Sequence, residues 1–128
     1  MIYDHWSQVT DWEWKHFSPQ EVACHGTGKL RINPKLLTCL ELLRILLNRP
    51  IVCNSVYRSP YHNAKLGGAI FSQHLLASAA DLSTNGQDRQ IMLNLAQEVG
   101  FTGFGYYHTF LHVDLGRPRE WGKEKWSD

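Results

Sequence analysis

The sequence predicts one small domain that combines helices with short strands, and three observations indicate this. Leucines between residues 33 and 48 recur at three- and four-residue steps, the period of an amphipathic helix. Apolar runs at 51–53 and 79–82 have the length of buried strands, and 101–107 and 110–115 flank a turn like the strands of a hairpin. With 128 residues, 43% of them hydrophobic, the chain is long enough for one core and too short for two.

The N-terminal part begins with an aromatic-rich segment and a short helix. Residues 5–17 contain several tryptophans without a clean period, and we expect them to pack against the core because tryptophan is mostly buried. Ser18 and Glu21 have the spacing of a capping box around Pro19, a residue suited to the first helical position. The sequence therefore predicts a helix from Pro19 to about Cys24.

The longest helix follows. It begins at Asn33–Pro34 by the same combination of N-cap and proline, and it ends near Asn48, before Pro50. A leucine stripe on such a helix is far more often core than partner surface, so we assign it to the back of the sheet. Residues 51–53 are predicted as a buried central strand that delivers residues 54–58 to its end.

The second half alternates strands and helices. Residues 60–68 are predicted as a short helix and a Gly-Gly turn, and 79–82 as a strand. The turn 83–86 precedes a helix at 87–99, which Gly100 is placed to end in a left-handed conformation. We assign four residues to the buried face of this helix: Ile91, Leu95, Ala96 and Val99.

The charge pattern and the N-terminus exclude several classes of protein. The net charge is +1, and charges of both signs are scattered along the chain, so there is no basic stripe for nucleic acid. Residues 1–14 include three carboxylates and no apolar run, which fits neither a signal peptide nor a membrane span. We expect no nucleic-acid partner and no transmembrane segment.

The three cysteines are an odd number without a CxxC pair, which argues against a structural zinc knuckle and against a disulfide framework. We interpret them mainly as small buried hydrophobic residues. Oxidation of one pair stays open as an alternative.

Two histidines and an aspartate form a candidate metal-ligand set. Zinc takes nitrogen or oxygen donors, and a catalytic site uses three protein ligands and lowers the pKa of its water to about 7. His74 and Asp81 are seven residues apart, unlike an i, i+4 pair on one helix, so we expect His74 to end a loop and Asp81 to lie on a strand. His112 and Asp114 alternate on a second strand and share a face. Either histidine alone would be an ordinary core or surface residue, and other divalent metals also fit such a set.

The context of these residues is a family resemblance. Residues 72–81 read Ser-x-His-x-x-Ala-x-x-Ala-Asp; residues 55–59 (SVYRS) precede them, and 103–106 (GFGY) and 110–114 (FLHVD) follow. This combination resembles the zinc D-Ala-D-Ala peptidases of the M15 type, over about residues 17–121.

The resemblance implies a fold and an activity. It implies a single α+β peptidase domain over residues 1–128, with a central antiparallel sheet flanked by helices as in the hedgehog/DD-peptidase-like fold. One Zn²⁺ would be held by His74, Asp81 and His112. The substrates would be bacterial peptidoglycan stem peptides, cut by a carboxypeptidase or by an endopeptidase of the endolysin type. We expect a monomer that acts on the cell wall, either as a phage lysin released from the host cytoplasm or as a periplasmic or secreted mature domain.

The resemblance also implies roles for other residues. Arg58 would line the active site, where its guanidinium holds a substrate carboxylate or stabilises an oxyanion. Ser72 would contact substrate near the metal. Many relatives place a general base a few residues before the last ligand, but Thr109 occupies that place here and cannot transfer a proton. His108 and Asp114 are the alternatives, and Asp114 also fits a role in orienting the last histidine ligand.

Ala77 is a second departure, because the family usually has glycine at this position. If the backbone needs a positive φ, alanine costs roughly 1 kcal/mol there. The methyl group would also narrow the cleft.

A competing function stays open. A non-catalytic zinc-containing module that recognises cell wall or a protein partner would keep the three ligands and lack the base. Metal-dependent hydrolysis separates the two.

Overall fold

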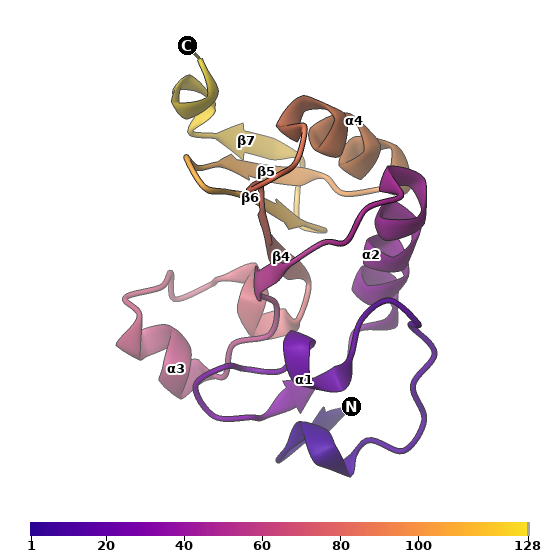
Figure 1. Ribbon diagram of the computed structural model, residues 1–128. Coiled ribbons are helices and arrows are strands. Elements are labelled where there is room, and N and C mark those ends of the chain that lie inside the picture. The colour runs from indigo at the N-terminus through magenta and orange to yellow at the C-terminus, as the bar shows by residue number, and fades with distance from the viewer. Residues whose placement is uncertain (128) are drawn as a thin grey trace.

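The computed structural model describes residues 1–127 and confirms an α+β fold (Figure 1). Its centre is a five-stranded sheet with the order β3-β4-β6-β5-β7. Neighbouring strands run antiparallel, except that β7 pairs with β5 in parallel, so the sheet is mixed. The strands are β3 (Cys53–Ser55), β4 (Ala79–Ser83), β5 (Gly103–Tyr106), β6 (Phe110–Asp114) and β7 (Arg119–Trp121).

Within residues 1–127, four α-helices accompany the sheet: α1 (Pro19–Val22), α2 (Pro34–Leu47), α3 (Pro60–Lys65) and α4 (Arg89–Val99). In Figure 1, α2 and α4 lie together on one side of the sheet, while α1 and α3 lie below it. A small second sheet pairs β1 (Ile2–Tyr3) with β2 (Leu30–Arg31), and three 3-10 helices complete the fold. These are η1 (Trp6–Gln8), η2 (Gln73–Leu76) and η3 (Lys123–Trp126).

The predicted helix starts are confirmed by their caps. At the start of α1, the Ser18 hydroxyl accepts from the backbone N–H of Glu21 at 3.2 Å, and the Glu21 carboxylate accepts from the N–H of Ser18 at 2.6 Å. The Asn33 side chain caps α2 by accepting from Leu36 N–H. This helix ends at Asn48, which takes a left-handed conformation with φ of 54°.

The core lies between the sheet and the two longer helices, and one assignment on α4 is wrong. The leucine stripe of α2 is buried as predicted at Leu36, Leu37, Leu40 and Leu43, and Leu47 at its end is partly buried. Helix α4 buries Met92, Leu93 and Ala96. Ile91, which we assigned to the buried face, is 49% exposed. Each residue turns a helix by about 100°, so Ile91 lies beyond the edge of a face that is centred near Met92 and Ala96.

The strand predicted at 51–53 also needs correction. The paired strand is β3, two residues further on, and it is an edge strand that bonds to β4 alone. Ile51 is buried, but Val52 is 62% exposed. A short apolar run indicates that a segment is buried, but it does not indicate how many strands lie beside that segment.

The structure also describes the state of the cysteines and the length of the apolar helices. Cys24, Cys39 and Cys53 are free and buried, as expected for small hydrophobic residues. Within residues 1–127, no helix is both long and apolar enough to cross a bilayer.

Candidate metal centre

The pairing of β4 with β6 places two of the three predicted ligands side by side. Asp81 and His112 are direct partners in the antiparallel register, and both lie on strands as predicted. Directly opposite residues project to the same face of a sheet. The Asp81 Oδ1 atom is 2.9 Å from His112 Nδ1, so the sheet itself preassembles an oxygen and a nitrogen donor.

His74 reaches the same place from a short 3-10 helix rather than from the loop that we predicted. The hydroxyl of Ser72 caps η2 by accepting from the backbone N–H of His74 at 3.2 Å. The ring of His74 is 3% exposed, and its Nδ1 donates to the carbonyl of Val56 at 2.6 Å. This bond leaves Nε2 as the nitrogen with a free lone pair.

The surroundings of His74 Nε2 indicate whether the site suits a metal ion. This atom lies 3.2 Å from Asp81 Oδ2. It is buried, and within residues 1–127 it makes no hydrogen bond. A buried nitrogen without a partner is costly, and a metal ion would satisfy it. One donor atom from each of His74, Asp81 and His112 lies within 4.8 Å of the others, and we call these three residues the ligand cluster. Two imidazoles and one carboxylate fit Zn²⁺.

The charges of the ligand cluster are coupled. Burial opposes the ionisation of Asp81, but contacts with the His112 and His74 imidazoles outweigh it and hold the pKa of Asp81 well below its usual range. Burial lowers the pKa of His112, but hydrogen bonds to Asp114 and Asp81 outweigh that effect and raise it. A carboxylate that stays ionised is the form in which aspartate binds a metal.

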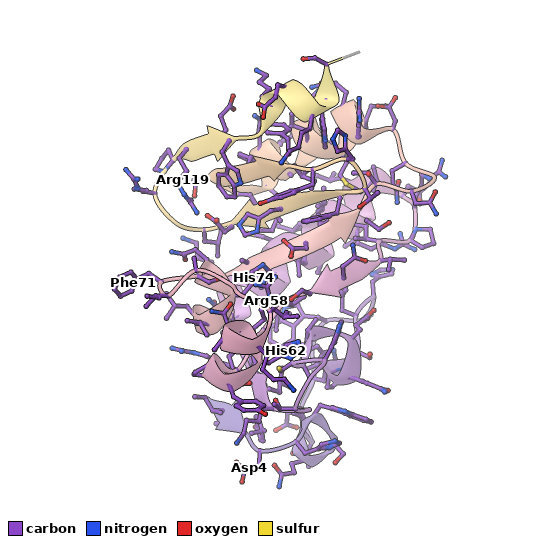
Figure 2. All side chains as sticks on the ribbon, turned by 90° about the vertical axis from the view of Figure 1, so that its left-hand side faces the viewer. Asp4, Arg58, His62, Phe71, His74 and Arg119 are labelled. Carbon is purple, nitrogen blue, oxygen red and sulfur yellow. The ribbon has the colours of Figure 1, made fainter. Side chains whose placement is uncertain are left out.

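Arg58 lies beside the ligand cluster, as the resemblance implied. Its Nη2 donates to Asp81 Oδ2 at 3.2 Å, its Nε to Ser55 Oγ at 3.1 Å, and its Nη1 to Asn63 Oδ1 at 3.3 Å. The side chain is 17% exposed and lines the pocket described below. Figure 2 shows Arg58 close to His74, at the lower edge of the sheet.

Asp114 lies behind His112 and has no exposed surface. Its Oδ2 is 2.7 Å from His112 Nε2, so the two aspartates occupy opposite sides of one imidazole ring. With Nε2 taken by Asp114, Nδ1 is the nitrogen of His112 that faces the ligand cluster. Arg119 of β7 donates two hydrogen bonds to the Asp114 carboxylate, at 2.8 and 2.7 Å.

The ligand cluster opens into a pocket of about 330 Å³, which Ser72 also lines. Aromatic rings form part of its wall: Tyr107 and Phe110 stack with centroids 4.3 Å apart, and Trp121 Nε1 donates to the hydroxyl of Tyr107 at 3.1 Å. Phe71 borders the pocket, is 91% exposed and extends away from the body in Figure 2.

The sequence-based interpretation missed Arg119, Trp121 and the aromatic wall. Arg119 and Trp121 lie in the tail after the motif, in a strand too short to show a period. The signal that points to Arg119 is indirect. An aspartate that orients a buried ligand from behind needs a cationic partner, and Arg119 is one of two arginines that follow Asp114 closely in the sequence.

The structure does not bring His108 to the ligand cluster. His108 belongs to the turn between β5 and β6 and lines a separate pocket with Arg89 and Thr109. It is four residues from His112, and a strand advances about 3.3 Å per residue, so the hairpin carries its imidazole away from the metal site. The expectation that the turn swings this imidazole over the metal is therefore corrected.

Ala77 does adopt the suspected left-handed conformation, with φ of 54° and ψ of 29°. Its methyl group is buried with Cys24 and Tyr57. Among the described residues that line the pocket, Ala77 is absent, so the expected narrowing of the cleft is not observed.

Comparison with known proteins agrees with this geometry. Residues 15–114 match the profile of a family described as Peptidase M15. The chain is also 35% identical over 79 residues to the zinc D-Ala-D-Ala carboxypeptidase of Streptomyces albus G, an alignment that covers 58% of this chain and 31% of that protein. The chain thus matches less than a third of this relative's length. The match to the family profile covers most of the chain and includes all three residues of the ligand cluster. The chain therefore belongs to the Peptidase M15 family.

Proposed function

We propose that the protein is a zinc-dependent peptidase that cleaves amide bonds in the stem peptides or crosslinks of bacterial peptidoglycan, with one zinc per chain. The observation that carries the proposal is the buried Nε2 of His74, which has no hydrogen-bond partner within residues 1–127 and faces the ligand cluster. The similarity to a zinc D-Ala-D-Ala carboxypeptidase supports this choice of metal and substrate, and a carboxypeptidase is our first choice over an endopeptidase of the endolysin type.

The three ligands are assigned atom by atom. His74 would bind through Nε2, His112 through Nδ1 and Asp81 through its carboxylate, because the other ring nitrogens already contact Val56 and Asp114. A zinc ion held there supplies Lewis-acid chemistry, polarising a carbonyl and lowering the pKa of water.

Arg58 is the proposed group for binding substrate and stabilising charge. Within the described residues, three of its five N–H donors have partners in Ser55, Asn63 and Asp81, which leaves two for a ligand in the pocket. Those donors suit a terminal carboxylate or a developing oxyanion. Ser72 lines the same pocket and is proposed to contact substrate.

One observation favours a second candidate function. Among residues 1–127, no imidazole or carboxylate lines the pocket apart from the ligand cluster. His108 lines a separate pocket, which leaves Asp114 as the proposal for the general base, although its carboxylate is already engaged by His112 and Arg119. A zinc-containing module that binds cell-wall peptides without cutting them would have such a lining.

The experiment is digestion of purified bacterial peptidoglycan by three samples: zinc-loaded protein, chelated protein and His74→Ala. A peptidase releases D-Ala or cleaved muropeptides from the first sample alone, and the product masses identify the bond. If the zinc-loaded protein binds stem peptides but releases no product, the binding module is the correct function.

A further inference from the structure

Four hydrogen-bond contacts hold the carboxylate of Asp114. Arg119 donates two parallel hydrogen bonds to it, from Nη1 to Oδ1 at 2.8 Å and from Nη2 to Oδ2 at 2.7 Å. The backbone N–H of Gly116 donates to Oδ1 at 2.9 Å. The remaining contact of Oδ2 is to His112 Nε2 at 2.7 Å. The carboxylate is therefore fixed in position and plane, and its fourth contact is to a residue of the ligand cluster.

A glycine in the sheet leaves space for the ion pair between Asp114 and Arg119. Gly103 of β5 lies between its two register partners, Asp114 on β6 and Arg119 on β7. A Cβ atom at Gly103 would lie 2.0 Å from Asp114 Oδ1 and 2.2 Å from Arg119 Nη1. The pair therefore crosses the middle strand at Gly103, a position where that strand has no side chain.

Arg119 itself is held in place. Its guanidinium lies over the ring of Trp121, 5.0 Å from the centroid, and its Nη1 also donates to the carbonyl of Arg117 at 3.0 Å. Trp121 packs in turn over Gly105, where a Cβ would approach the indole to 2.5 Å. Its ring centroid is 5.1 Å from that of His112. β7 thus brings both a cation and an aromatic ring to the side of the ligand cluster that His112 occupies, where both also line the pocket.

We propose that Arg119 is a positioning residue of the metal site: it fixes Asp114, and Asp114 turns the His112 ring so that Nδ1 faces the metal. Partners that orient a ligand imidazole typically change metal affinity by about 10- to 100-fold when they are removed. The inference rests on the metal site of the proposed function and deepens it, because it assigns part of the metal affinity to a strand outside the ligand motif.

A purely structural role makes a different prediction. If the ion pair only attaches β7 to the sheet, its loss lowers the thermal stability of the metal-free protein and leaves the metal affinity of the folded molecules unchanged. Metal affinity and stability must therefore be measured separately.

The test is a titration of the metal-free protein with Zn²⁺ against a competing chelator. It compares wild type, Arg119→Gln, Arg119→Lys and Arg117→Gln. Arg117 is exposed and two residues away, so its variant is the matched control. Co²⁺ absorption spectra report the ligand geometry, and thermal unfolding of the metal-free proteins reports stability.

We expect Arg119→Gln to weaken zinc binding about 10- to 100-fold and to alter the Co²⁺ spectrum. Arg119→Lys keeps the charge without the fork of two donors and should fall between wild type and Arg119→Gln, and it also serves if the glutamine variant does not fold. Because Arg119 acts through Asp114, Arg119→Gln should add no further loss in an Asp114→Asn background.

Equal zinc affinity in wild type and both Arg119 variants, or equal losses with and without the Asp114 carboxylate, would overturn the inference. Failure of the wild type to bind Zn²⁺ would instead overturn the proposed function. The two failures are thus distinguishable in one titration series.

Discussion

Asp81 Oδ1 and His112 Nδ1 lie 2.9 Å apart because the two residues are direct partners in the β4–β6 register. A slip of one residue in that pairing would turn one of the two side chains to the other face and dismantle the site. The ligand geometry therefore depends on the register of the central strands, and the buried core on the other face of the sheet fixes that register. Only His74 comes from outside the sheet.

The metal-free protein should lose stability at both ends of the pH range. The pKa values of Asp81 and Asp114 are lowered in the fold, so their contribution is present above the unfolded value, near 3.9, and is lost as the pH falls toward the folded values. The pKa of His112 is raised, so its contribution is present below about 6.5 and is lost as the pH rises through the folded value. Urea unfolding from about pH 3 to about pH 9 measures both declines.

The variant His112→Gln distinguishes the loss of stability at high pH from the loss at low pH. It should flatten the decline above about pH 6.5 because the titrating imidazole is gone. An unchanged decline on that side would show that another group is responsible.

Ala77→Gly tests the strain at the only alanine with a positive φ among the described residues. The change removes a buried methyl group, worth about 0.8 kcal/mol, but relieves roughly 1 kcal/mol of left-handed strain, so the free energy of unfolding should hardly change. Ala96→Gly is the matched control, because Ala96 is equally buried but helical. There the methyl and helix-propensity losses add to about 2 kcal/mol. Equal losses in urea unfolding at both sites would contradict strain at Ala77.

Arg58→Gln tests the proposed charge stabilisation in the peptidase reaction. If Arg58 contacts the developing oxyanion, kcat should fall by about 10²- to 10³-fold. If it only holds a substrate carboxylate, KM should rise while kcat stays near the wild-type value. Steady-state kinetics on a D-Ala-D-Ala peptide distinguish these results, and unchanged kcat and KM would remove Arg58 from the mechanism.

The helices could be predicted from sequence because their signals are local. The cap at Asn33, the leucine period and the end at Asn48 all lie within α2 itself. The capping box of α1 is equally local. The ligand cluster was predicted from a sequence motif. The spacing of that motif indicated the two strands, but it did not indicate the 3-10 helix that carries His74.

The remaining features depend on tertiary pairing. Strand β7, which pairs with β5 in parallel, has three residues and no alternating pattern. Neither the mixed sheet nor the position of Arg119 could therefore be predicted from the sequence. The edge position of β3 was hidden for the same reason. His108 was placed by its distance in sequence from His112, but a hairpin moves residues near its turn away from those inside the strand.

His74, Asp81 and His112 are proposed to hold one zinc ion. The most direct test of this proposal is equilibrium zinc titration of the metal-free protein and of His74→Ala, Asp81→Ala and His112→Ala, with His108→Ala as the control. The account predicts one tight site in wild type and in His108→Ala, and in each ligand variant a loss larger than the roughly 100-fold that a supporting partner contributes. Tight binding that persists in all three ligand variants would place the metal elsewhere and contradict the account.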